Sequence, residues 1–303
     1  MTVCVATICD DGKTIILVAD RMIGIGFIES EPDIHKLLEL HKEWWILFAG
    51  DDISPVFDIV DYAKEHIRKQ KGKRNVALDS PISLEVAMEA IREAYERKRM
   101  EQAAALYLTP IGWDISAFNL VGHSNLPDFG EIKAKIGDYT LNIELLVAGF
   151  DDGKACLFSL VGREGGLINR HDIPGFFSIG SGGIGAIYML YYREMSSKKP
   201  AREALYYAME AKLFGEQASG VGEKTDLHVV TSDGKFITLS EDAIEKKLVP
   251  VWNMLRPKWI GKKSRVILNA IPEIDGFAEI KKEEKPKRKK AKTSSKPPSK
   301  QKP

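Results

Sequence analysis

The sequence predicts an α+β protein in which two antiparallel sheets pack face to face between layers of helices. Three Asp-Gly pairs, Asp11-Gly12, Asp152-Gly153 and Asp233-Gly234, each lie between apolar or β-branched segments, a pattern typical of β-hairpins. The segments follow the order strands, two helices, strands, two helices, hairpin. Hairpin-linked sheets need helix cover on one face only, so a four-layer αββα sandwich is the most economical packing.

The first part of the chain is expected to be β-structure followed by two helices. Strands are expected over 3–9, 13–19, 22–28, 34–40 and 44–49, the last ending at Gly50. Ser54-Pro55 predicts a helix start, with Ser54 as N-cap, and an apolar stripe continues the helix to a basic loop at 69–75. A second helix is expected to begin at Ser83 and to end near Leu108.

The second part predicts an insertion and then a return to the sandwich. Residues 109–130 contain two prolines and three glycines and are expected to form an irregular inserted loop. Strands are expected over 131–137, 143–150, 155–161, 176–179, 225–230 and 235–239, and helices over 184–196, 201–214 and 241–255. These segments predict one domain over 1–262, a linker over 263–280 and a tail over 281–303.

Charge is distributed unevenly along the 303 residues. The tail, 281–303, holds 11 Lys and Arg against two Asp and Glu, whereas the other 280 residues carry 33 basic and 41 acidic side chains. The tail is expected to be disordered, and to attract nucleic acid only weakly. The acidic body argues against nucleic-acid binding by the domain itself, and the composition, 44% hydrophobic and 29% charged, excludes fibrous and wholly disordered classes.

Other features bear on compartment and cofactors. The three cysteines form no CxxC pair, no apolar run reaches the roughly 20 residues of a membrane span, and the N-terminus lacks a basic leader, so a cytoplasmic protein is expected. The six histidines show no metal-ligand spacing, and no cofactor is expected. Gly180, Gly182 and Gly185 spell GxGxxG, but hairpin-linked strands do not fit a dinucleotide-binding βαβ unit.

Thr2 is the candidate nucleophile. Met1 precedes a small residue and is therefore expected to be removed, which leaves a free threonine at the head of a strand. The α-amine of such a residue has a pKa of about 7.7–8.0 and can accept the proton of the neighbouring hydroxyl. One residue would then supply both nucleophile and base.

Further residues follow in a fixed order along the chain: Asp20, Lys36, Gly50, Ser181 within Gly180–Gly183, Glu216 and Ser219. Four of these residues also have an ordinary interpretation. Asp20 could form a surface pair with Arg21, Lys36 could extend to solvent, Gly50 could serve a turn, and Ser181 could cap a helix. The ordered set, over roughly 2–240, resembles the proteasome β-type subunits and the threonine peptidase of the bacterial two-component ATP-dependent protease, both N-terminal-nucleophile hydrolases.

The resemblance implies the N-terminal-nucleophile hydrolase fold and a role for each residue. Thr2 would attack the scissile carbonyl, Lys36 would favour its alkoxide, and Asp20 would hold Lys36. The Gly50 N–H would point into the oxyanion hole, and Ser181, Glu216 and Ser219 would position the amine and a water. A mostly apolar pocket for the residue before the cleaved bond would be lined by Ile23, Ile34, Leu38, Phe48 and Asp52.

The implied activity is that of a threonine endopeptidase acting on proteins or peptides inside a self-assembled homo-oligomeric ring, with an ATP-dependent unfoldase as a further partner. Two alternatives stay open: a non-catalytic structural subunit of the same fold, and an amidase that acts on a small amide. Glu216 stands where the family has aspartate, and the 109–130 insertion and the tail extend beyond the family core.

Overall fold

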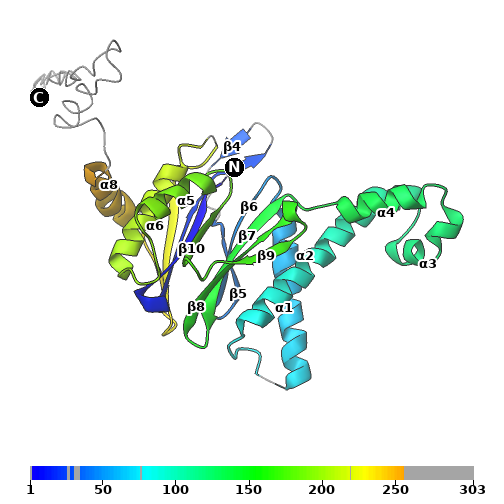
Figure 1. Ribbon diagram of the computed structural model, residues 1–303, viewed down its shortest axis with the longest axis horizontal. Coiled ribbons are helices and arrows are strands. Elements are labelled where there is room, and N and C mark those ends of the chain that lie inside the picture. Colours follow the sequence, from blue (N-terminus) through cyan, green and yellow to red (C-terminus); the bar gives the residue numbers. More distant parts are fainter. Residues whose placement is uncertain (1, 26–27, 31–34, 76, 219, 256–303) are drawn as a thin grey trace, which may run out of the picture. The chain divides into compact units, whose positions relative to one another are not determined.

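Two five-stranded antiparallel sheets form the centre of the structure, a computed structural model that describes residues 2–25, 28–30, 35–75, 77–218 and 220–255 (Figure 1). The first sheet has the strand order β10 (Phe176–Ile179), β1 (Cys4–Cys9), β2 (Thr14–Asp20), β11 (Thr225–Thr231), β12 (Phe236–Thr238). The second has the order β5 (Leu37–His41), β6 (Trp44–Gly50), β7 (Ile143–Asp151), β8 (Lys154–Val161), β9 (Leu167–Arg170). A separate hairpin joins β3 (Ile23–Ile25) to β4 (Ile28–Ser30).

The strand period of two sorts β1 into two buried faces. Cys4, Ala6 and Ile8 belong to the core between the sheets, where they meet residues of β6, β7 and β8. Val3 and Val5 belong to a second core under α5 (Gly183–Tyr192) and α6 (Ala201–Gly215). The first sheet is therefore covered by the second sheet on one face and by helices on the other.

The outer face of the second sheet is covered by α1 (Ser54–Arg74) and α2 (Leu84–Tyr107). Trp44, Ile46 and Phe48 of β6 share a core with the apolar stripe of α1 that includes Ile59 and Ala63. The layers thus follow the order helices, sheet, sheet, helices. The predicted α+β class with antiparallel sheets is confirmed, and the three Asp-Gly hairpins join β1 to β2, β7 to β8 and β11 to β12.

The ends of α1 differ from the expectation. The N-cap of α1 is Ile53 rather than Ser54, and Ser54 is the first helical residue. The Asp52 carboxylate accepts hydrogen bonds from the backbone N–H of Ser54, at 2.9 Å, and from its hydroxyl. The expected basic loop at 69–75 is wrong, because α1 continues through Lys, Arg and Gln, which are good helix formers. It ends at Asn75, which has a left-handed φ of 53°. The expected start of α2 is confirmed: the Ser83 side chain accepts from the N–H of Val86.

The expectation of an irregular insertion followed by a strand over 131–137 is wrong. The chain instead forms η2 (Thr109–Ile111), α3 (Ile115–Asn125) and α4 (Phe129–Asp138), which share a small core with the end of α2. Asp114 caps α3 through the N–H of Ala117 at 2.8 Å. Ile132 and Ile136 fit both a strand and a helix pattern, and the core formed with Phe118 selects the helix.

The remaining elements are short. Turns η1 (Asp10–Gly12) and η3 (Gly162–Glu164) follow β1 and β8, and α7 (Glu241–Ala243), η4 (Ile244–Leu248) and α8 (Val249–Leu255) continue one another where a last helix was expected. Contacts group the chain into a unit that ends at Asn253. The expected linker and tail lie outside the described residues. Among the helices that the structure describes, none has the length and apolar character needed to cross a bilayer.

Candidate active site

Antiparallel pairing brings three predicted residues to one end of the first sheet. Cys4 pairs with Ala19 on β2 and with Ile179 on β10, so the start of β1 lies beside the ends of both neighbours. Thr2 lies two residues before β1, Asp20 ends β2, and Ser181 lies two residues after β10. Residues separated by up to 179 positions therefore meet at the same edge.

Lys36 enters this edge from the second sheet, directly before β5. Its Nζ donates to Thr2 Oγ1 at 2.7 Å and to Asp20 Oδ1 at 3.0 Å. The three residues, Thr2, Lys36 and Asp20, are 4%, 2% and 0% exposed. Lys36 thus ends on a buried hydroxyl and carboxylate, which excludes the alternative that it extends to solvent.

Four donors hold the Asp20 carboxylate in place. Besides Lys36, Oδ1 accepts from the N–H of Val3 at 2.9 Å. Oδ2 accepts from the N–H of Met22 at 3.0 Å and of Gly222 at 3.1 Å. The carboxylate of Asp20 is thereby fixed as the ion-pair partner of the buried Lys36 side chain.

The segment that carries Lys36 is anchored by Asp226, a residue that the sequence analysis missed. Asp226 is 3% exposed on β11 and binds Arg21 Nε at 2.7 Å and His35 Nδ1 at 2.8 Å. Arg21 therefore pairs with Asp226 while Asp20 pairs with Lys36, unlike the simple Asp20–Arg21 pair considered above. The available signal was a lone acidic residue in the apolar strand 225–230.

Ser181 and its flanking glycines fit closely around Thr2. The Thr2 nitrogen donates to Ser181 Oγ at 3.2 Å, and the Gly182 N–H donates to the Thr2 carbonyl at 3.1 Å. Gly180 has a φ of +86°, and a Cβ there would lie 2.3 Å from the Thr2 carbonyl oxygen. The close approach to Thr2 explains the Gly180 position in the GxGxxG pattern without a nucleotide.

The resemblance implies that Glu216 positions the Thr2 amine, but in the structure Glu216 is linked to the site through other residues. Its carboxylate binds Nζ of Lys212, a fully buried residue of α6 that also donates to the carbonyls of Gly222 and Glu223, both at 2.9 Å. Burial raises the pKa of the Glu216 carboxyl, and Lys212 opposes that rise. Because the Gly222 N–H binds Asp20, Lys212 and Glu216 support the Asp20 side of the site. Ser219 lies outside the described residues.

A cavity of about 440 Å³ opens beside Thr2. It is lined by the end of β6 with Gly50, by Asn142 and Glu144, by Phe177, and by the first turn of α5. A Cβ on Gly50 would lie 2.7 Å from the Asn142 carbonyl oxygen, so the neighbouring strand already requires glycine there. Glu144 also lies here and accepts from the Gly180 N–H at 2.7 Å. The sequence analysis did not select Glu144; the available signal was a single charged residue in an apolar strand.

The residues expected to form the specificity pocket are placed differently. Phe48 is fully buried in the core with α1, against Phe57, and Leu38 packs against the same core. Both side chains are therefore used for packing under the helices, and the cavity beside Thr2 has other walls. Asp52 is exposed and accepts a hydrogen bond from the N–H of Ser54 at the start of α1. Ile34 and the side chain of Ile23 lie outside the described residues.

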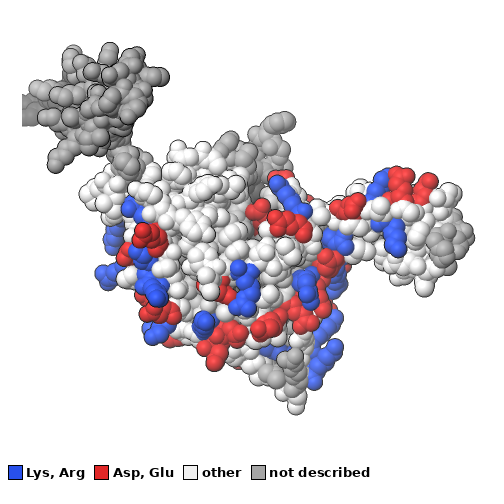
Figure 2. Space-filling view, viewed as in Figure 1, with Lys and Arg blue, Asp and Glu red and all other residues white. Residues whose placement is uncertain are grey.

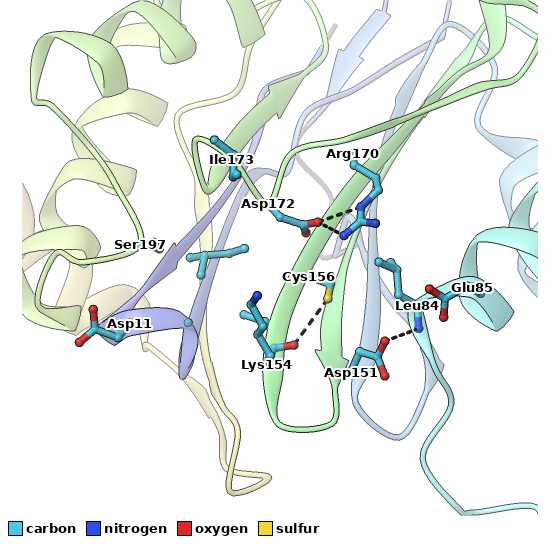
Figure 3. A pocket seen from close by; sticks show the side chains of 13 residues that line it. Asp11, Leu84, Glu85, Asp151, Lys154, Cys156, Arg170, Asp172, Ile173 and Ser197 are labelled. Carbon is cyan, nitrogen blue, oxygen red and sulfur yellow. Dashed lines mark hydrogen bonds and ion pairs between the residues drawn. The ribbon is translucent and has the colours of Figure 1, made fainter.

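A second cavity, of about 680 Å³, lies at the other end of the β1–β2 hairpin (Figure 3). Its charged groups are largely engaged within the fold: Arg170 binds Asp172 at 2.9 Å, and Asp151 accepts from the N–H of Leu84 at 3.2 Å. Burial raises the pKa of the Cys156 thiol to about 11, which leaves it unreactive near neutral pH. This cavity lacks the juxtaposed nucleophile and cation seen at Thr2.

The arrangement around Thr2 suits nucleophilic chemistry. A hydroxyl that accepts a hydrogen bond from a buried ammonium can form an alkoxide more readily than a free hydroxyl, because the positive charge stabilises the anion. The adjoining cavity gives a substrate carbonyl room beside Oγ1.

The sequence matches no protein-family model and no curated protein. Interpretation of the site therefore depends on this geometry.

Proposed function

We propose that this protein is a threonine endopeptidase with the N-terminal-nucleophile hydrolase fold. The observation that carries the proposal is the buried Lys36 ammonium, 2.7 Å from Thr2 Oγ1 and 3.0 Å from Asp20 Oδ1. The positions of Thr2, Asp20, Lys36 and Ser181 around one edge support it further.

The proposed reaction begins once removal of Met1 has made the Thr2 nitrogen an amine. That amine accepts the Oγ1 proton, and Oγ1 attacks the peptide carbonyl carbon. Gly50, on the cavity wall, supplies an N–H for the oxyanion, and the amine then protonates the leaving nitrogen as the C–N bond breaks. A water, deprotonated by the same amine, hydrolyses the resulting ester and restores Thr2.

Self-assembly belongs to the same proposal. Ile184, Tyr188 and Tyr192 are spaced four residues apart on α5 and are 70%, 68% and 77% exposed. Figure 2 shows few charges on the surface over this helix. An exposed apolar helix face of this kind is typical of a protein–protein interface, which supports a homo-oligomer that encloses the Thr2 sites.

Intact mass combined with labelling by a β-lactone, an electrophile that acylates nucleophilic hydroxyls, tests the proposal. We expect a mass without Met1 and a single adduct on Thr2 in the wild type, and no adduct in Thr2→Ala. Lys36→Met should reduce labelling and peptide cleavage by at least about 100-fold, since each ~1.36 kcal/mol of lost stabilisation is tenfold. Lys135→Met, at an exposed lysine of α4, is the matched control.

The outcomes also separate the alternatives. A non-catalytic subunit would form the native-size assembly without any adduct. A small-amide hydrolase would form the adduct but leave fluorogenic peptides uncut. Retention of Met1 in a protein that cleaves peptides would overturn the mechanism, because an acylated nitrogen is not a base.

A further inference from the structure

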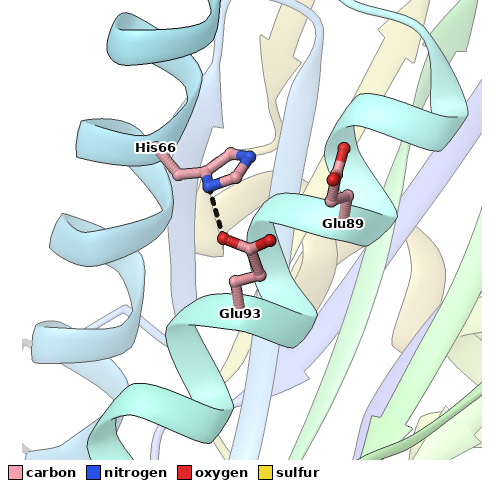
Figure 4. Close-up of side chains that lie close together, drawn as sticks. All are labelled: His66, Glu89 and Glu93. Atoms are coloured by element: carbon pink, nitrogen blue, oxygen red, sulfur yellow. Dashed lines mark ion pairs between the residues drawn. The ribbon is translucent and has the colours of Figure 1, made fainter.

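Two helices bring three metal-binding side chains together on the outer layer of the fold. His66 lies on α1, and Glu89 and Glu93 lie one turn apart on α2 (Figure 4). One ligand atom from each residue lies within 4.8 Å of the others, and His66 Nδ1 is 2.8 Å from Glu93 Oε2. The residues come from separate helices, so their spacing in the sequence gives no sign of the cluster.

A fourth group completes the arrangement. Gln70, one turn after His66, places Nε2 at 2.7 Å from His66 Nε2 and 2.9 Å from Glu89 Oε2. Its carbonyl Oε1 is buried and, among the described residues, has no hydrogen-bond partner. A buried carbonyl without a partner is unfavourable. Because Nε2 is the amide atom that faces His66 and Glu89, the carbonyl would reach a cation at the cluster after the amide turns over by 180°.

The cavity beside these residues is lined by as many basic as acidic side chains. Lys69 and Arg97, which line the same cavity of about 490 Å³, already bind Glu65 at 2.7 and 3.1 Å. Lys73 lines the cavity as well. Glu89 and Glu93 together offer two negative charges against one imidazole, which binds metals in its neutral form.

We propose that His66, Glu89 and Glu93 form a site for a divalent transition-metal ion of the Zn²⁺ type that links α1 to α2, with the Gln70 carbonyl as a fourth ligand once its amide has turned over. Imidazole nitrogen and carboxylate oxygen are established zinc ligands with bonds of about 2.0–2.2 Å, so tetrahedral ligand atoms lie roughly 3.3 Å apart. The present separations, from 2.8 Å to at most 4.8 Å, need side-chain adjustments of about 1 Å. The site is independent of the proposed peptidase reaction.

Metal titration of the full-length chain, freed of metal by a chelator, tests the site. We expect one equivalent of Zn²⁺ to compete with a chromophoric chelator, and Co²⁺ to give a visible d–d spectrum. His66→Ala and Glu93→Gln should weaken Zn²⁺ affinity at least about 100-fold, since even partners of the ligands contribute 10–100-fold. Glu96→Gln, on the same helix but bound to Arg99, is the matched control and should bind like the wild type.

A stability readout checks that the metal connects the helices. Zn²⁺ should raise the thermal midpoint of the wild type and of Glu96→Gln, and should leave that of Glu93→Gln unchanged. Glu93 is more than half exposed, so its isosteric variant is expected to fold. Equal Zn²⁺ affinity in all variants, no binding by the wild type, or a preference for Mg²⁺ over Zn²⁺ would overturn the assignment.

Discussion

Replacing Asp20 by asparagine tests the central feature of the site, the carboxylate that accepts four hydrogen bonds. Oδ1 accepts from Val3 and Lys36, and Oδ2 accepts from Met22 and Gly222. Asparagine keeps the shape but turns one of these oxygens into an NH₂ group. Whichever way the amide is oriented, two donors then face a donor.

The favoured orientation keeps the oxygen toward Lys36 and leaves the N–H groups of Met22 and Gly222 without an acceptor. Each buried, unsatisfied donor costs about 1–3 kcal/mol, and Lys36 loses its compensating charge. We therefore expect the free energy of unfolding to fall by about 4 kcal/mol, a large part of the 5–15 kcal/mol typical of a folded domain.

Urea unfolding followed by tryptophan fluorescence measures this change. With a denaturant slope of about 3 kcal/mol per molar, the midpoint of Asp20→Asn should lie more than 1 M below that of the wild type. Asp61→Asn, at an exposed position of α1, is the control and should unfold like the wild type. A midpoint for Asp20→Asn within about 0.3 M of the wild type would refute the four-donor description, whatever the protein's activity.

Three further predictions follow from other parts of the molecule. Gly180→Ala places a Cβ 2.3 Å from the Thr2 carbonyl oxygen and should lower the thermal midpoint of unfolding. The control is Gly153→Ala, because Gly153 has a similar φ of +74° but a Cβ there would meet no atom within 4 Å, and its midpoint should fall far less. Equal midpoints in the two variants would contradict the close packing of Gly180 against Thr2. Burial lowers the pKa of His171 to about 4, against 6.5 in the unfolded chain, so the unfolded state binds more protons between these values. The free energy of unfolding should therefore fall as the pH drops from 6.5 toward 4. In His171→Gln this fall should be less steep. Deleting 279–303, a segment rich in lysine, should weaken binding to a polyanion column and leave Thr2 labelling unchanged; loss of labelling would show that the segment is not dispensable.

The elements that the sequence predicted well have strong local signals. Asp-Gly turns predicted the hairpins, whereas β1 and β2 are buried along their whole length, so only the structure shows which residues face each core. The insertion was misjudged because prolines and glycines at its ends suggested a loop, while its short helices depend on a shared core around Phe118. A pattern such as Ile132–Ile136 fits two periods, and only tertiary packing decides between them.

The candidate site divides in the same way. Thr2, Asp20 and Ser181 were candidates because their order along the sequence resembles that of a known family, and antiparallel pairing now explains why they meet at one edge. Lys212 and Asp226 could not, since each acts through a neighbour: Lys212 holds the carbonyl of Gly222, whose N–H holds Asp20.

Glu216 shows how residues that act on the site only through a neighbour could affect the proposed mechanism. The glutamate at this position reaches the buried Lys212 rather than Thr2, and the two side chains form an ion pair. A buried ion pair of this kind is destabilising when one partner is removed, because the other charge is then left uncompensated. Glu216 and Lys212 are therefore expected to depend on each other, and loss of either should disturb Asp20 through the main chain at Gly222 while Thr2 and Lys36 keep their own side chains intact. The chemistry at Thr2 would then depend on the α6 helix as much as on the residues that touch the hydroxyl.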